Sequence, residues 1–249
     1  MNFIYVLNGK KIKNTLLIVL ISFFTAVLLF TQNIVHIPVF SVKDGPKAIY
    51  KGENGIALTF DLGWGDERAE PIIETLIKNN INRATFFLSG SWAERHPDLV
   101  KKIVENKFEI GILGYSYTDY TSLENSEIRK DIQKAQAVFK KLQVKDIKLL
   151  RAPTGHFDKR VIQIANQYGL TIVHWSVNTN DWKNPGVNKI IENGSKARNG
   201  DIILLHASDS AKQTKKALPD LIQRIKDKGD FVTVSDMMTN GKVHTTLVP

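Results

Sequence analysis

The sequence predicts an α/β domain built on a parallel sheet and preceded by one N-terminal transmembrane helix. Short apolar runs alternate with segments of helical periodicity over most of the 249 residues, a pattern typical of strands joined by crossover helices. Near the N-terminus a long uncharged apolar stretch replaces that alternation. The hydrophobic content of 43% and the charged content of 24% are those of an ordinary globular protein, so disorder is not expected.

The N-terminal segment predicts a membrane anchor. Residues 16–30 carry no charge, and Lys10, Lys11 and Lys13 stand just before them. Extended to 15–35, the segment reaches the ~20 residues that a span requires. Because lysines tend to stay inside, we expect a single-pass protein of the cell membrane with its domain outside the cytoplasm. A cleaved secretion signal and a buried core helix are the alternatives, but no small-x-small cleavage site follows Phe30.

The chain is expected to divide into five segments. These are a cytoplasmic tail over 1–14, the anchor over 15–35, a linker over 36–50, the α/β domain over 51–240 and a C-terminal tail over 241–249. Strands are expected at 55–60, 84–88, 109–112, 147–151, 170–177, 201–205 and 230–234. Helices are expected at 68–79, 99–104, 128–142, 158–168, 185–197 and 218–225. The continuous apolar character of the strands fits a sheet covered on both faces, either an open doubly wound sheet or a small barrel.

Composition limits the possible chemistry and partners. The absence of cysteine excludes disulfides, thiolate nucleophiles and Cys-based zinc sites. The net charge of +9 suits an anionic neighbour such as a cell-wall polymer or lipid headgroups, although an ordinary basic surface explains it equally well. No basic run is interleaved with aromatic residues, so a nucleic-acid partner is not expected. No Gly-rich phosphate loop follows the first strand, which argues against nucleotide binding.

Polar residues gather where the predicted strands end. Asp61 ends the first strand, Arg151 the fourth and His206 the sixth, and Asp181 with Trp182 follows the fifth. Active sites of parallel α/β folds form at this edge of the sheet. An Asp beside a guanidinium stays ionised and can act as a base, whereas a His bonded to a second carboxylate can act as a general acid. We therefore expect Asp61 to pair with Arg151 and His206 with Asp181, although each alone has an ordinary structural explanation.

Several segments around these residues resemble a known family. The order TFD, RAP, NDW and LLH, with the longer segments FDLGWGDE, GYSYTDYTSL, LLRAPTGHFDKR, NDWKNPG and LLHASDSAKQT, is similar to the polysaccharide deacetylases with a NodB-type domain. The similarity covers about residues 50–240 and is greatest to the membrane-anchored, sporulation-associated branch. It implies a distorted (β/α) barrel of about seven parallel strands. It also implies hydrolysis of N-acetyl groups on a cell-wall glycan, either peptidoglycan or spore cortex.

The resemblance also implies a role for each candidate residue. Asp61 matches the catalytic base, Arg151 the residue that holds it, His206 the general acid and Asp181 the partner of that acid. Trp182 matches a wall of the substrate groove. The further candidates for contact with sugar rings are Trp64, Tyr115, Tyr117 and Pro153.

The metal-binding positions of the family are replaced in this chain. The family binds a divalent metal, usually zinc, through a second Asp beside the base and an H-x-x-x-H pair. The corresponding residues here are Leu62, Leu113 and Tyr117. Leucine cannot coordinate a metal and neutral tyrosine is a poor zinc ligand, so no metal is expected at this position. A different and less favoured metal site would use Asp66, His156 and Asp209.

Two hypotheses therefore follow from the sequence. The retained acid–base residues favour a deacetylase-like hydrolase that acts on wall glycan. The replaced ligands favour a metal-free relative that binds wall glycan, or a wall- or spore-assembly partner, without turnover.

Overall fold

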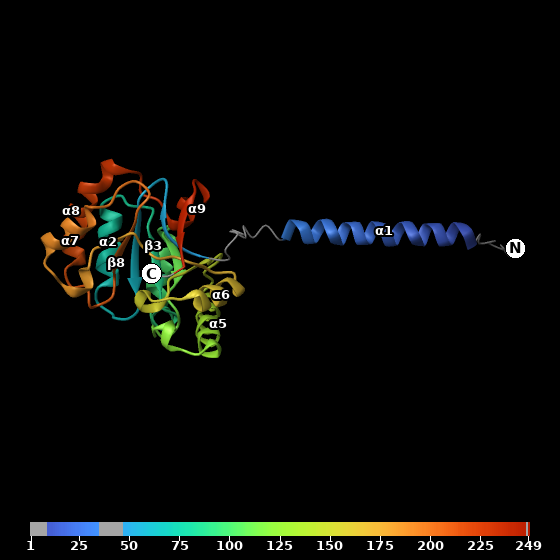
Figure 1. The fold of residues 1–249 in the computed structure, drawn as a ribbon, viewed down its shortest axis with the longest axis horizontal. Helices are drawn as coiled ribbons and strands as arrows, with labels where there is room; N and C mark the ends of the chain where they lie inside the picture. Colours follow the sequence, from blue (N-terminus) through green and yellow to red (C-terminus); the bar gives the residue numbers. More distant parts are fainter. Residues whose placement is uncertain (1–8, 35–46, 248) are drawn as a thin grey trace. The chain divides into compact units, whose positions relative to one another are not determined.

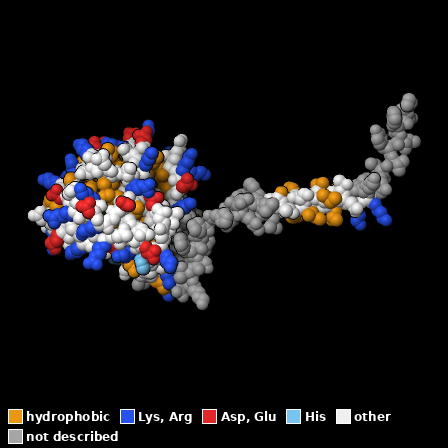
Figure 2. Space-filling view, turned by 90° about the horizontal axis from the view of Figure 1, so that it is seen from above, with side chains coloured by type: hydrophobic (Ala, Val, Ile, Leu, Met, Phe, Trp, Pro, Cys, Tyr) orange, Lys and Arg blue, Asp and Glu red, His pale blue; other side chains and the backbone are white. Residues whose placement is uncertain are grey.

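The computed structural model describes residues 9–34, 47–247 and 249. Two compact units are present, over Met1–Asp44 and Gly45–Pro249. In the first unit, α1 (Gly9–Ile34) exposes its apolar side chains from Leu16 to Phe24 (Figure 2). Among helices within the described ranges, none combines the length and the apolar character needed to cross a membrane. The anchor predicted over 15–35, whose last residue lies outside those ranges, is not supported by that finding and stays a prediction.

The second unit is built on a seven-stranded parallel sheet (Figure 1). The strand order is β6-β5-β4-β3-β2-β8-β7, and every pair in it is parallel. The strands are β2 (Ala57–Leu62), β3 (Thr85–Leu88), β4 (Glu109–Ile112), β5 (Leu149–Leu150), β6 (Thr171–Ile172), β7 (Val177–Asn178) and β8 (Ile202–His206). This arrangement confirms the predicted α/β class with about seven parallel strands.

A two-stranded antiparallel ribbon lies beside the sheet. It pairs β1 (Ala48–Gly52) with β9 (Val243–Thr246). Single bridges join β1 to both sides of the sheet, from Ile49 to Val173 after β6 and from Lys51 to Asp201 before β8. The seven strands therefore form a curled sheet whose edge strands β6 and β7 are not paired with each other. The bounds predicted for the linker and the C-terminal tail stay predictions, although β1 begins in the former and β9 lies in the latter.

The two faces of the sheet have different neighbours. Along β2, Leu58, Phe60 and Leu62 belong to the large core shared with the helices. The alternate residues Thr59 and Asp61 point to the concave face, because successive side chains of a strand face opposite ways. A smaller apolar cluster fills the concave side beneath the strand ends. Asp61 thus projects from the inner face of a strand that is buried along its whole length.

Most helices of this unit pack on the convex side, but Val234 and Met237 near the C-terminus belong to the concave cluster. α2 (Ala69–Lys78), α7 (Val187–Gly194) and α8 (Thr214–Ile225) lie together, and α5 (Asn125–Lys141) packs on α6 (Lys159–Gln167) (Figure 1). The others are α3 (Gly90–Arg95), α4 (Pro97–Glu105) and α9 (Val234–Thr239). Local chemistry defines their starts: a capping box joins Glu124 and Glu127 at α5, and Asp158 accepts a bond from the Val161 N–H at α6. The six helices predicted from periodicity are confirmed.

Two predicted strands are wrong. The segment 170–177 is not one strand, because it forms β6 and β7 on opposite edges of the sheet. Between them the chain turns, since the carbonyls of Val173 and His174 accept bonds from Arg151 instead of continuing a ladder. The segment 230–234 makes only a single bridge, from Phe231 to Ile56. Its apolar run then enters α9, whose first turn is fixed by the Thr233 cap.

We expect Phe86→Ala to destabilise the domain by about 3–5 kcal/mol, the usual cost of removing a large buried ring. Phe86 is fully buried in β3 and stacks on Phe60, with ring centroids 5.1 Å apart. The measurement is urea unfolding followed by tryptophan fluorescence. Val104→Ala is the control, because Val104 is 46% exposed and its loss should change the unfolding free energy by less than about 1 kcal/mol. Equal effects of the two substitutions would contradict this description of the core.

Candidate active site

The site lies at the carboxyl ends of the adjacent strands β2 and β8. Asp61 and His206 are direct partners in the parallel register of these strands. Neighbouring strands run ~4.8 Å apart, so the two backbones are held side by side by the sheet itself. Both residues are buried, with 6% and 9% of their surface exposed. The sheet therefore fixes a carboxylate and an imidazole next to each other without help from a loop.

Asp61 is held by a buried arginine. Arg151 Nη1 donates to Asp61 Oδ1 over 2.7 Å and to Thr59 Oγ1 over 2.9 Å. The other two nitrogens of the guanidinium donate to backbone carbonyls, Nε to Val173 at 3.2 Å and Nη2 to His174 at 3.0 Å. The predicted pair of Asp61 with Arg151 is therefore present. The guanidinium thus makes four hydrogen bonds, one of them an ion pair that holds Asp61 in place.

His206 is held by a second carboxylate. Its Nδ1 lies 2.7 Å from Asp181 Oδ1, and its backbone N–H donates to Asp181 Oδ2 over 2.8 Å. Two further donors reach Asp181, the Thr214 hydroxyl at 2.6 Å and the Trp182 N–H at 3.0 Å. Because the ionised carboxylate is an acceptor only, Nδ1 carries the proton and Nε2 faces the site. The predicted pair of His206 with Asp181 is also present.

This environment changes the proton affinity of the imidazole. Burial alone would lower the pKa of His206, and the positive charge of Arg151 acts in the same direction. The hydrogen bond to Asp181 and the negative charges of Asp181 and Asp61 outweigh both, so the pKa lies above its ordinary value. A raised pKa favours the protonated imidazole, which is the form that can donate a proton from Nε2.

Two atoms of the site remain available. Within the described part of the chain, no group is hydrogen-bonded to Asp61 Oδ2 or to His206 Nε2. The arrangement thus presents one acceptor oxygen and one donor nitrogen from neighbouring strands to the same space. This is the geometry of a general base beside a general acid.

Comparison with known proteins agrees with this geometry. The sequence profile described as polysaccharide deacetylase matches residues 49–173. A peptidoglycan-N-acetylglucosamine deacetylase of Bacillus cereus is 34% identical over 191 residues, which cover 75% of this chain and 89% of that protein. The chain belongs to the polysaccharide deacetylase family. Among solved structures, BA3943, described as a CE4 family pseudoenzyme from Bacillus anthracis, is similar with a TM-score of 0.72 and 28% identity, covering 78% of this chain and 69% of that one.

Another similar relative is longer than this chain. The uncharacterized protein YlxY of Bacillus subtilis is 34% identical over 198 residues, which cover 78% of this chain and 61% of YlxY.

Two exposed tryptophans flank the pair in this deacetylase domain. Trp64 follows β2 and is 48% exposed, and Trp182 follows β7 and is 46% exposed. Trp64 thus follows the strand on one side of β8, and Trp182 follows the strand on the other side. The loop that carries Trp64 is fixed by the Trp92 indole N–H, which donates to the Gly65 carbonyl at 2.7 Å. The surface beside the acid–base pair therefore has apolar rings in defined positions.

The other candidates for sugar contact are more enclosed. Tyr115 is half-buried, its hydroxyl donates to Glu94 over 3.2 Å, and the Lys134 ammonium lies 3.6 Å from its ring centroid. Pro153 is buried in a short turn after β5. Both stand near the strand ends, but neither presents an open ring face comparable to those of Trp64 and Trp182. Their assignment to substrate stays a prediction.

The residues aligned with the metal ligands of the family do not fit a cation. Leu62 is fully buried in the core on the convex side, and Leu113 is fully buried in the concave apolar cluster. Tyr117 is partly buried against that cluster, and burial, followed by the charge of Asp61, raises its pKa to about 12. Two hydrocarbon side chains and a neutral phenol do not form a donor set for zinc.

The alternative metal site is not assembled. Asp209 is used as a cap, since its oxygens accept the backbone N–H groups of residues 66–68 at 2.9–3.0 Å. Asp66 instead contacts His96 at 2.8 Å, and His156 contacts Asp119 at 2.7 Å. Across the residues that the structure describes, no group of three or more potential ligands surrounds a common point. Asp66, His156 and Asp209 thus have separate partners in this structure, and the less favoured metal site stays a prediction.

Sequence reasoning missed the threonines that support the pairs. Thr59 bonds Arg151, and it stands two residues before Asp61 on the same face of β2. The period of a strand could have identified it. Thr214 begins α8 and reaches Asp181 across 33 positions of sequence. No local signal marks that contact.

We expect Asp181→Asn to lower the pKa of His206 below the ordinary value of about 6.5, because burial and Arg151 would then act with little opposition. In the unchanged protein, the stabilisation from protonated His206 is complete below the unfolded pKa and is lost as the pH rises through the raised folded pKa. The measurement is an NMR titration of the imidazole, assigned with His206→Asn. Glu105→Gln, which removes an exposed carboxylate on α4, is the control. An unchanged His206 pKa in Asp181→Asn would refute this account.

Proposed function

We propose that the domain is a deacetylase-like hydrolase of N-acetylated cell-wall glycan. The observation that carries the proposal is the pairing of a free Asp61 Oδ2 with a free His206 Nε2 at one strand edge. The family to which the chain belongs supports the class of substrate, since the B. cereus relative is named a peptidoglycan-N-acetylglucosamine deacetylase. The exposed indoles of Trp64 and Trp182 offer faces on which sugar rings can stack.

The reaction follows from the roles of these groups. Asp61 takes a proton from a water molecule, whose oxygen attacks the acetyl carbonyl and forms a tetrahedral intermediate. His206 Nε2 gives its proton to the amide nitrogen as the C–N bond breaks, which releases acetate and leaves an amino sugar. Arg151 holds the Asp61 carboxylate in place, and Asp181 orients His206 and raises its pKa. No step depends on a bound metal.

The second candidate is a relative that binds wall glycan, or a wall-assembly partner, without turnover. The replacement of the metal ligands by Leu62, Leu113 and Tyr117 favours it, because a metal normally supplies a nucleophilic water and polarises the carbonyl. BA3943 is described as a pseudoenzyme, and a mutant of it as having restored enzymatic activity. The fold is therefore compatible with either outcome. The membrane anchor, the location outside the cytoplasm and the link to sporulation rest on the sequence pattern and the resemblance.

We expect the full-length protein to release acetate from N-acetylated wall glycan at the same rate with and without a chelator. Asp61→Asn should reduce that rate at least about 100-fold, because the general base is lost. Glu105→Gln should leave the rate unchanged. Release that requires zinc would contradict the metal-free reaction. Binding without release would favour the second candidate, and neither binding nor release would refute both.

We expect Trp64→Ala and Trp182→Ala each to weaken binding of a chitin oligosaccharide about 3- to 10-fold, because each removes one ring face. The measurement is calorimetric titration of the full-length protein. Ile77→Ala is the control, since Ile77 is similarly exposed, at 39%, on α2 away from the strand ends. Unchanged affinity in both tryptophan variants would place the glycan elsewhere.

A further inference from the structure

The site contains one polar atom that the proposed reaction does not use, the hydroxyl of Tyr117. We propose that Tyr117 donates a hydrogen bond to the acyl oxygen of the N-acetyl group and so stabilises the charge that develops there. This inference rests on the proposed function, and it names a catalytic residue where the family places a metal ligand.

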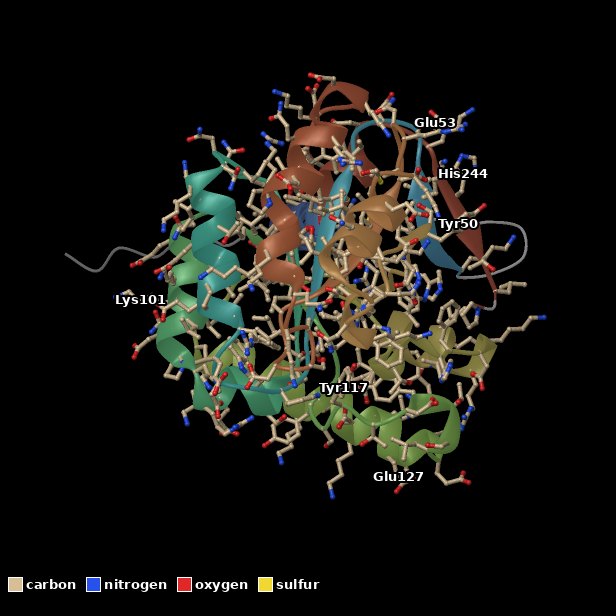
Figure 3. The ribbon with its side chains drawn as sticks, turned by 90° about the vertical axis from the view of Figure 1, so that its left-hand side faces the viewer. Tyr50, Glu53, Lys101, Tyr117, Glu127 and His244 are labelled. Atoms are coloured by element: carbon tan, nitrogen blue, oxygen red, sulfur yellow. The ribbon has the colours of Figure 1, made fainter. Side chains whose placement is uncertain are left out.

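The backbone brings Tyr117 to the base. Tyr117 follows β4, which is separated from β2 by β3. Its side chain nevertheless reaches the end of β2, because a Cβ placed on Gly63 would lie 2.7 Å from ring atom Cδ2 of Tyr117. Only glycine permits this approach two residues after Asp61. Figure 3 shows Tyr117 at the opposite end of the domain from Glu53, which follows β1.

The position of Tyr117 has a conformational cost. Its φ of 55° lies in the left-handed region, which residues other than glycine rarely adopt. A residue in this strained conformation persists where its surroundings determine it. Its ring packs with the concave apolar cluster that contains Leu113. The ring is therefore held in place beside the acid–base pair.

The hydroxyl is unengaged. Within the described residues, no hydrogen bond joins the Tyr117 hydroxyl to another group, whereas the hydroxyls of Tyr115 and Tyr120 are bonded to Glu94 and Asp131. The hydroxyl is also not among the fully buried polar atoms that lack a partner. Burial and the negative charge of Asp61 keep the phenol protonated over the working pH range. A neutral donor that is already positioned is the kind of group that stabilises an oxyanion.

The other groups of the site are committed elsewhere. Arg151 gives its Nε, Nη1 and Nη2 bonds to Asp61, Thr59 and two carbonyls. His206 Nε2 is needed at the leaving nitrogen. Leu62 and Leu113 have no donor. Among the side chains described around Asp61, Tyr117 is thus the group suited to the acyl oxygen.

The experiment compares the full-length protein with its Tyr117→Phe variant, which keeps the ring and removes the hydroxyl. Acetate release from N-acetylglucosamine tetramer gives kcat and KM. Calorimetry gives the affinity ratio between that tetramer and the fully deacetylated tetramer. We expect Tyr117→Phe to lower kcat about 100-fold with little change in KM, as for other oxyanion donors. If no acetate is released, we expect a preference for the acetylated tetramer that falls about tenfold in the variant.

Tyr168→Phe is the matched control, because it removes the hydroxyl of a half-buried tyrosine at the end of α6, away from the carboxyl ends of the strands, and should leave both measurements unchanged. Circular dichroism of each variant verifies the fold. An unchanged kcat and an unchanged affinity ratio in Tyr117→Phe would overturn the role of Tyr117 and leave the proposed function standing. Failure of the unsubstituted protein to bind or hydrolyse either tetramer would overturn both.

Discussion

The buried charge of Arg151 is the constraint on which both the fold and the site depend. Its guanidinium lies inside the curled sheet, 4.1 Å from the ring centroid of Phe87. Burial lowers its pKa and the charge of Asp61 opposes that change, so the guanidinium stays protonated. Such a charge is tolerated only when it is paired and fully hydrogen-bonded. The hydrogen bonds of the Arg151 guanidinium also connect the end of β5 to β2 and to the turn after β6. The arrangement of the site therefore follows from the neutralisation of this buried charge.

His206 is held in a different way from Asp61. Asp181 belongs to the turn after β7, and four donors from three parts of the chain saturate its oxygens. The imidazole is therefore oriented by a loop that is itself rigid, while its backbone belongs to the sheet. Asp61 is therefore positioned by the buried Arg151 side chain, whereas His206 is positioned by Asp181 in a loop at the edge of the sheet. Each half can be altered without removing the other, which is how a related fold could lose turnover and keep its architecture.

The sequence predicted the polar residues at the strand ends better than the elements that surround them. Parallel strands end on the same side, so Asp61, Arg151 and His206 could be brought together from their positions at strand ends alone. The division of 170–177 into two edge strands was not predictable, because Val173 and His174 have partners distant in sequence, among them the Arg151 side chain. The same applies to Thr214 and to the cap at Asp209, whose partners are distant in sequence. A local sequence pattern indicates which residues are buried and whether a segment is a helix or a strand. It does not identify a hydrogen-bond donor that is distant in sequence.

The surroundings of Leu62, Leu113 and Tyr117, as well as these residues themselves, disfavour a metal site. Asp61 is paired with Arg151 and His206 with Asp181, and neither pair supplies a donor in place of the three replaced ligands. Leu62 points into the core on the convex side, beside Leu58 and Phe60. A carboxylate introduced at position 62 alone would be buried without a partner. Its desolvation penalty would exceed any electrostatic stabilisation. Recovery of a metal site would therefore need changes at Leu62, Leu113 and Tyr117 together with a shift of the strand end, and a single substitution would first destabilise the core.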